Sequence, residues 1–519
     1  MSNIKIYLLI TAIIFYAFNA LGLGLCLQDD AFISLRYAMN FSQGNGLVYN
    51  LGEKVEGYTN FSWTIISSIP FFLNIDGVTF LRYLGLLSGC LAILAVFILT
   101  RIFVSKDSIS PGISSLILAS IPYFRAESIM GLETVFYGAM IILSVSAYIY
   151  EERNYSRICL SGLLLTFTVL TRPDGLIVAG IIGLIDLSSI LKKKTFNKKL
   201  ILRWSFFIPP VVTHFIFRFF YYGDIVPNTF HTKVGNSLSV LFRGINYGVV
   251  YFHKNLILII ISIIGATILL MSRKLPTKEK TTLFLIPAIY ILYVCFIGGD
   301  FKPTFRFYIV ITLYLAFLSS VAIEKTSQQF LLMTKKPALF MCLMVGITGL
   351  FSMPLNANDY ALRRFTSERK QSIQFVQDAA FYLKAIYPPQ TIIATGNAGG
   401  IPFFTEFTSI DMYGLCDRHI AMRIIPEMGR GFPGHEKGDG VYVLDRNPDL
   451  IFFQEIQFTK QKISMDEIKK MHLSLSETEI WENRLFHSNY KLENIRLKNY
   501  YFNFFKKKIS PIVLAEINL

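Results

Sequence analysis

Long apolar runs recur along this chain and constrain its fold more than any other feature. Examples are residues 6–26, 80–104 and 283–297, which approach the roughly 20 residues that a helix needs to cross a bilayer. Of the 519 residues, 53% are hydrophobic and only 16% are charged, and the mean hydropathy is +0.48. A soluble globular fold is therefore excluded. The sequence predicts an α-helical, polytopic membrane protein.

Basic residues orient these runs. The formal charge is +15 at pH 7, which could indicate nucleic-acid binding, but the lysines and arginines occur in short segments between the apolar runs and not on one soluble face. Short loops rich in Lys and Arg remain in the cytoplasm. We therefore expect cytoplasmic segments around residues 101–106, 153–157, 192–199, 273–280 and 325–336.

Counting apolar runs between these segments predicts about eleven membrane-spanning helices. No small-x-small cleavage site precedes Gln28, so the first run is expected to be an uncleaved span and not a signal peptide. The run 61–74 is short and contains Pro70, and the parity of the count requires it to lie in the interface without crossing. The expected spans lie near 6–26, 78–104, 110–123, 131–150, 158–171, 175–191, 201–221, 255–271, 283–298, 305–323 and 337–353.

The other loops then share the outer face, and they hold nearly all the polar motifs. They comprise residues 28–60, 125–133, 171–175, 221–236 and 298–306. An odd number of spans sends the C-terminal part to the same side. We thus expect a membrane domain at 1–355, with its first outer loop at 27–77, and an outer domain at 356–519.

The C-terminal part has the pattern of an α/β domain. Short apolar runs at 391–395, 408–412 and 450–453 alternate with polar, helical stretches near 366–386 and 464–476.

Two carboxylates, Asp29 and Asp30, open the first outer loop. The apolar spacing that follows predicts an interfacial helix with Asp29, Arg36 and Asn40 on its wetter face. An aspartate at this position can simply cap the helix. A carboxylate can also take the proton from an acceptor hydroxyl during sugar transfer from a polyprenyl phosphate. Both interpretations stay open on position alone.

Sugar transfer of this kind also needs cations for the leaving phosphate. A lone interfacial Lys or Arg often reaches toward lipid phosphates instead, so each candidate is weak singly. The candidates on the outer face are Arg36, Arg172, His231, Lys233, Lys302 and Arg306, with His214 and Arg218 near the end of their span.

Other polar residues on this face have competing structural explanations. Glu56, Tyr58 and Asn60 could contact sugar hydroxyls or satisfy the backbone of a buried loop. Asp224 and Asn228 flank Pro227 and could build a turn, and residues 171–175 are typical of a tight turn. Asp300 follows two glycines and could bind sugar.

Metal and nucleotide sites receive little support. Five of the six cysteines lie in apolar runs and there is no CxxC pair, so neither disulfides nor a zinc site are predicted. His435 and Glu436 lack the second histidine of a zinc-protease motif, and residues 397–400 lack a full nucleotide-binding glycine pattern, which favours a packing role. No cofactor is required, although Mg²⁺ or Mn²⁺ could be shared by carboxylates and phosphate.

The segment DDAFISLRYA at residues 29–38 resembles the first outer loop of GT-C glycosyltransferases related to terminal arabinofuranosyltransferases and lipopolysaccharide-biosynthesis homologues. Further segments agree in order along the chain. They lie at 44–50, 53–63, 131–134, 170–175, 221–230, 298–301, 411–420 and 433–437.

The resemblance implies a GT-C fold and an inverting transfer from a polyprenyl-monophosphate sugar to a cell-envelope glycan or lipid. It places the reaction on the outer face of a bacterial inner membrane. It implies that the first acidic residue, Asp29, is the base and Asp30 its helper or cap, and it adds Glu133 to the sugar- or acceptor-binding residues. One branch of the family suggests arabinofuranose, but pocket shape decides the sugar.

Two competing functions remain. A flippase or transporter of a lipid-linked sugar should carry ionisable groups near the bilayer midplane or paired broken helices, whereas here the span centres are almost uncharged. An O-antigen ligase or polymerase would act at the same location but would use a polyprenyl-diphosphate donor. A comparison of mono- and diphosphate donors distinguishes it from a glycosyltransferase that uses a polyprenyl-monophosphate donor.

Overall fold

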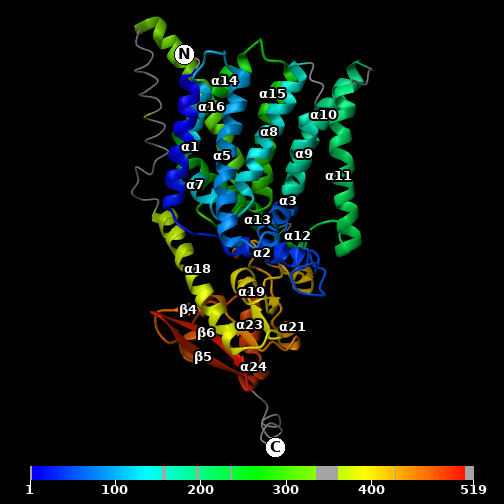
Figure 1. Cartoon of the computed structure of the whole chain (residues 1–519), viewed down its shortest axis with the longest axis vertical. Helices are drawn as coiled ribbons and strands as arrows, with labels where there is room; N and C mark the ends of the chain where they lie inside the picture. The colour runs from blue at the N-terminus through cyan, green and yellow to red at the C-terminus, as the bar shows by residue number, and fades with distance from the viewer. Residues whose placement is uncertain are drawn as a thin grey trace, which may run out of the picture.

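A computed structural model of the chain describes residues 3–154, 159–193, 198–233, 237–334, 346, 360–426 and 428–508. Apolar helices form a bundle, and a strand-containing domain covers one end of it (Figure 1). Apart from Gly346, the expected span 337–353 and the expected domain boundary at 355 lie outside the described residues.

Seven helices in the described part of the chain are long and apolar enough to cross a membrane. The chain is therefore a multi-pass membrane protein, as the sequence predicts. Two of the seven include a short 3-10 turn at their start, η1 (Pro173–Gly175) and η2 (Arg306–Tyr308). The seven are α1 (Ile4–Gly22), α5 (Gly77–Phe103), α8 (Thr134–Arg153), α10 (Leu176–Lys193), α11 (Lys198–Tyr222), α15 (Thr277–Phe296) and α16 (Ile309–Thr334).

Several expected spans differ from a simple straight crossing. α6 (Ser110–Ser120) and α9 (Leu160–Thr171) are apolar but shorter, and α14 (Leu256–Met271) is bent by 87° from the preceding α13 (Leu238–Lys254). The bent pair would make an eighth span if counted as one. The amphipathic α13 was not among the expected elements, and the expectation of about eleven crossings stays a prediction.

The first outer loop contains the expected helix, α2 (Asp29–Ser42), followed by the short α3 (Phe61–Ile66) and α4 (Ile69–Phe72). The expected wet face of α2 is wrong. Arg36 and Asn40 are buried. The C-terminal domain packs over Arg36 through α19 (Gly400–Thr405), whereas Asn40 donates to the carbonyl oxygens of Val48 and Tyr49 in the same outer loop.

The C-terminal domain begins with the long helix α18 (Tyr360–Ile386) and contains one six-stranded mixed sheet. β1 pairs in parallel with β2 and β3, whereas β6 pairs antiparallel with β3, β4 and β5. The stretch 464–476 is helical only at its start and end. The strands are β1 (Ile392–Thr395), β2 (Thr408–Asp411), β3 (Leu450–Phe452), β4 (Phe458–Thr459), β5 (Tyr490–Leu497) and β6 (Tyr500–Lys507).

Short helices connect these elements. In the membrane part they are α7 (Pro122–Ser128) and α12 (Asn228–Lys233). In the C-terminal domain they are α20 (Arg418–Met422), α21 (Gly440–Asp445), η3 (Gln454–Ile456), α22 (Met465–Ile468), α23 (Leu475–Glu482) and α24 (Arg484–Asn489).

Small residues let the membrane helices approach closely, which is how helices associate where lipid removes the hydrophobic driving force. α14 meets α16 at Gly265, where an added Cβ would lie 2.0 Å from the carbonyl oxygen of Leu318. In contrast, nothing lies within 4 Å of the Cβ position of Gly180 on α10.

We predict that Gly265→Ala lowers the thermal unfolding midpoint of the detergent-solubilised protein, because the new methyl group must push α14 from α16. The expected cost is about 1–3 kcal/mol, the range for overpacking. The matched control Gly180→Ala should leave the midpoint unchanged or raise it slightly. Equal midpoints for the two variants would contradict the close packing.

Candidate active site

A cavity of about 330 Å³ lies at the end of the helical bundle that faces the C-terminal domain. It is lined by residues from all five loops that the sequence placed on the outer face, and by Leu415 and Pro433 of the C-terminal domain. The predicted convergence of these loops is confirmed.

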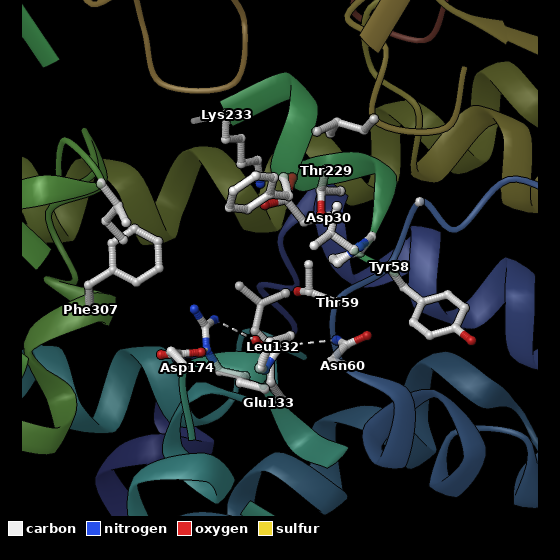
Figure 2. Close-up of a pocket in the computed structure, with 18 of the residues that line it drawn as sticks. Asp30, Tyr58, Thr59, Asn60, Leu132, Glu133, Asp174, Thr229, Lys233 and Phe307 are labelled. Atoms are coloured by element: carbon white, nitrogen blue, oxygen red, sulfur yellow. Dashed lines mark hydrogen bonds and ion pairs between the residues drawn. The ribbon is translucent and has the colours of Figure 1, made fainter. Parts of the chain in front are cut away.

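Asp30 stands at one end of this cavity within a cluster of cations (Figure 2). Its Oδ2 accepts hydrogen bonds from Lys302 Nζ at 3.0 Å and from Arg306 Nη1 at 3.2 Å. Arg306 also pairs with the buried Asp300. Burial raises the pKa of the Asp30 carboxyl, but the charges of Lys302, Arg306 and Lys233 outweigh it and hold that pKa well below its usual range. Asp30 is therefore an anion.

Lys233, at the end of α12, extends its side chain toward Asp30 (Figure 2). Its ammonium group makes no hydrogen bond or ion pair within 4 Å to any residue that the structure describes. Burial lowers the pKa of Lys233, an effect that the charge of Asp30 opposes. A half-buried cation of this kind is suited to receive an anion.

A second polar cluster lies at the opposite end of the cavity (Figure 2). Arg172 is held between two carboxylates, donating to Glu133 at 2.9 Å and to Asp174 at 2.9 Å. Asn60 donates to the other oxygen of Glu133 at 2.8 Å. Two carboxylates around one guanidinium leave this end with hydrogen-bond acceptors in excess.

Apolar and aromatic side chains form much of the wall between the two clusters. Tyr58 and Phe307 lie on opposite sides of the cavity in Figure 2. Further apolar lining comes from α11, α12 and α15 and from the residues beside them, with Phe215, Ile225, Phe230, Tyr293 and Ile297. Phe215, Tyr293 and Ile297 gave no functional signal in the sequence, because each lies in or beside an ordinary apolar run. Asp174 was interpreted as part of a turn, and it lies within the 3-10 turn η1 and also lines the cavity.

Asp29 does not line the cavity, and its expected role as base stays a prediction. Its two carboxylate oxygens accept hydrogen bonds from the backbone N–H groups of Gly399 and Gly400, each at 2.9 Å. These groups begin α19 of the C-terminal domain. At Gly399 an added Cβ would lie 1.9 Å from the carbonyl oxygen of Asp29, so only glycine permits this approach. The expected packing role of residues 397–400 agrees with these contacts.

Arg36 also contributes to the contact between the first outer loop and the C-terminal domain, and it does not line the cavity. The buried guanidinium donates to the carbonyl oxygens of Tyr49 at 2.6 Å, Phe407 at 2.7 Å and Pro402, and to the side chain of Asn50. Asn50 in turn donates to the carbonyl oxygen of Ser409 at 2.9 Å. Because its donors are taken up by protein oxygens, Arg36 is not a phosphate ligand in this arrangement.

Four further candidates, Glu56, Asp224, Asn228 and His231, lie beside the cavity, whereas Arg218 lines it. Glu56 pairs with Arg218 at 2.7 Å, and burial raises the pKa of Glu56 to about 7 even though Arg218 opposes the shift. Asn228 donates to the carbonyl oxygens of Gly414, Leu415 and Asp417. Asp224 accepts from Val226 N–H in the expected turn and pairs with His231 at 3.0 Å.

The described residues offer no ready set of metal ligands. Across the described residues, no group of three or more His, Cys, Asp or Glu side chains is placed to hold a metal ion. Asp29 and Asp30 also face different partners, so the pair does not converge on one point. The sharing of Mg²⁺ or Mn²⁺ with a phosphate stays a prediction.

Comparison with known proteins identifies relatives of this chain. A family model described as a domain of unknown function (DUF8728) matches residues 361–505, in the C-terminal domain. The chain is 28% identical over 220 residues to the terminal beta-(1->2)-arabinofuranosyltransferase of Mycobacterium tuberculosis (strain ATCC 25618 / H37Rv). That match covers 39% of this chain and only 34% of the relative, so the two proteins correspond over about a third of the relative's length.

Two solved structures share the architecture. ArnT from Cupriavidus metallidurans, determined with bound undecaprenyl phosphate, superposes with a TM-score of 0.56 at 10% identity over 79% of this chain and 86% of ArnT. Arabinofuranosyltransferase AftD from Mycobacteria superposes with a TM-score of 0.52 at 11% identity over 97% of this chain and 40% of AftD. The chain therefore has the GT-C fold and resembles arabinofuranosyltransferases, as the sequence predicts.

We predict that Asp29→Asn loosens the C-terminal domain from the first outer loop, because an amide offers one acceptor oxygen where two N–H groups need partners. Amide hydrogen exchange of α19 in the solubilised protein should accelerate by about tenfold or more, which corresponds to the roughly 1–3 kcal/mol cost of leaving a buried donor unpaired. Asp30→Asn is the matched control and should leave exchange in α19 unchanged. Equal protection in both variants would contradict the docking role of Asp29.

Proposed function

We propose that the protein is a GT-C glycosyltransferase that moves a sugar from a polyprenyl-monophosphate donor to a glycan or lipid acceptor. One observation carries the proposal. A carboxylate, Asp30, and three cations meet at one end of a largely apolar cavity that opens at the end of the membrane helices. A lipid-borne sugar phosphate presents the complementary features, a charged head group on an apolar chain.

The phosphate of the donor would bind among Lys233, Lys302 and Arg306. Charge-assisted hydrogen bonds to phosphate are stronger than neutral ones, and arginine can make two of them in parallel. Lys233 has no competing partner among the described residues, whereas Lys302 and Arg306 must share Asp30 and Asp300. Lys233 is therefore the cation whose charge is most available to the donor. The likeness to ArnT, which was determined with bound undecaprenyl phosphate, supports a polyprenyl phosphate as the ligand.

Asp30 would act as the base that takes the proton of the acceptor hydroxyl as it attacks the anomeric carbon. Its neighbouring cations make it a weak base before a donor binds. A bound phosphate would neutralise these cations and so raise the pKa of Asp30. Donor binding would thus increase the basicity of the group that the next step needs, which favours reaction only after the donor has arrived.

The sugar would extend from the phosphate toward the second cluster. Glu133, Asp174 and Asn60 supply acceptor and donor atoms for hydroxyl groups there. Asp300 stays close to the phosphate through Arg306. The identity of the sugar follows from pocket shape and is open to test, with arabinofuranose as the first choice from the resemblance.

The competing functions fit the site less well. A transporter needs ionisable groups along its path across the bilayer, whereas the charged groups that line the cavity gather at one end of the bundle. A diphosphate donor carries more negative charge than the cluster balances, because Asp30 and Asp300 already offset two of the three cations. We also propose that this end of the bundle faces the periplasm of a bacterial inner membrane, because the described basic segments at 101–106 and 273–280 lie at the other end (Figure 1).

A panel of synthetic polyprenyl-monophosphate sugars offered to the purified protein tests the proposed reaction. We expect Asp30→Asn to bind the productive donor with near wild-type affinity but to lower turnover by at least about a hundredfold, the range for loss of a general base. The control Asp107→Asn removes an exposed carboxylate from a loop between membrane helices and should retain full activity. Retained turnover in Asp30→Asn would rule out Asp30 as the base.

Substitution of Lys233 tests the phosphate site separately. Lys233→Gln should raise the KM for the monophosphate donor by about tenfold, the loss expected for one hydrogen bond to a charged group. The control Lys460→Gln changes an exposed lysine of the C-terminal domain and should have no effect. If wild type prefers a diphosphate donor, or if Lys233→Gln changes neither KM nor turnover, the proposed phosphate site is incorrect.

A further inference from the structure

The turn at residues 431–437 of the C-terminal domain reaches the cavity. Pro433 lines the cavity. The backbone at Gly434 packs against the side chain of Lys233, where an added Cβ would lie 3.0 Å from Lys233 Cε. Gly434 also has φ of +80°, a conformation that favours glycine. The turn is therefore fitted against one of the cations of the Asp30 cluster.

Two exposed aromatic rings lie together beside this turn. Phe432 is 66% exposed and Phe301 is 46% exposed. Their ring centroids are 5.4 Å apart in an edge-to-face arrangement. Exposed apolar side chains that lie together can mark a binding surface for a ligand or a partner.

His435 completes the group. Its ring packs against Tyr413 at 4.6 Å and against Phe301 at 5.8 Å between centroids. Nδ1 lies 3.2 Å from the carbonyl oxygen of Pro433, whereas Nε2 makes no hydrogen bond to a residue that the structure describes. His435 also interacts electrostatically with Asp30, Lys233 and Lys302. A polar atom thus remains available between the aromatic pair and the reacting carboxylate.

The loop that carries these residues is held in place. Glu436 accepts hydrogen bonds from the N–H groups of Gly429 at 2.6 Å and Gly431 at 2.8 Å. Arg243 of α13 pairs with Glu436 at 3.0 Å and donates to the carbonyl oxygen of Gly431 at 2.9 Å. The rings are therefore presented on a fixed support, which lowers the entropic cost of binding.

We propose that Phe301, Phe432 and His435 form the binding site for the sugar ring of the acceptor glycan. Sugar rings present C–H groups that pack on aromatic faces, and their hydroxyls would reach His435 Nε2. The site adjoins the reacting group, since Lys302 follows Phe301 in sequence and bonds Asp30 at 3.0 Å. The inference rests on the proposed glycosyl transfer, because it assigns the second substrate of the same reaction.

The alternative occupant is membrane lipid, since α13 nearby carries exposed apolar residues such as Phe242. The location favours the acceptor. The donor's lipid chain would leave the cavity along the apolar wall, whereas Pro433 brings the turn of the C-terminal domain to the cavity. Phe432 precedes Pro433 in this turn, so an acceptor that reaches Asp30 along the C-terminal domain would meet the rings.

Kinetics with the full-length protein in nanodiscs test the site. The probes are the productive donor from the panel and, as acceptors, synthetic arabinofuranosyl and mannosyl oligosaccharides. Phe432→Ala and Phe301→Ala should each raise the acceptor KM by about five- to tenfold, while donor KM and donor hydrolysis without acceptor stay at wild-type values. The control Phe381→Ala removes an exposed ring from α18 and should change nothing. An equal loss of donor hydrolysis would overturn the acceptor assignment.

A binding measurement that needs no turnover separates this inference from the proposed reaction. The fluorescence of a Phe432→Trp variant, less that of wild type, should shift saturably with a soluble oligosaccharide from the panel and should not be quenched by brominated lipid in the nanodisc. Such a shift in a protein without transferase activity would refute the proposed reaction but retain a glycan site. Quenching by brominated lipid, or no response to any oligosaccharide, would overturn the glycan site.

Discussion

The contact on which the active-site geometry depends is the one between Asp29 and the start of α19. Both carboxylate oxygens are occupied by the N–H groups of Gly399 and Gly400, so the first turn of α2 is fastened to the C-terminal domain. Asp30 is the next residue in the same turn, and successive helical residues point about 100° apart. With Asp29 fixed in one direction, Asp30 must face the cavity. Arg36, a further two turns along α2, holds the same surface through carbonyl oxygens of both parts.

This arrangement gives the C-terminal domain a role beyond covering the membrane part. Its turns contribute Leu415 and Pro433 to the cavity, and its α19 fixes the helix that presents Asp30. The cavity itself separates charge along its length, with the cations around Asp30 at one end and the acceptor-rich Arg172 cluster at the other. That separation matches a phosphate at one end and a hydroxyl-bearing sugar at the other. The intervening apolar wall suits the lipid that carries them.

The sequence predicts the large features because they follow from composition and from the charge asymmetry between loops. The membrane helices, the convergence of five loops and the helix after Asp29 are all found. The sequence could not assign separate roles to Asp29 and Asp30. These adjacent aspartates differ only in the direction of their side chains, and that direction depends on a contact with the distant backbone at Gly399. The phosphate contact expected for Arg36 is not found for a similar reason, because its partners are backbone carbonyl oxygens, which a pattern of side chains does not reveal. The amphipathic α13 was missed because Arg243 and Asn246 interrupt its apolar residues, so that it contains no long apolar run.

The most direct test is a cryo-electron microscopy structure of the protein in a nanodisc with undecaprenyl phosphate. The account predicts the phosphate within hydrogen-bond distance of Lys233, Lys302 or Arg306, with Asp30 facing it and Asp29 still bound to Gly399 and Gly400. A phosphate held by Arg36 or Asp29, with Asp30 turned away from the cavity, would contradict it.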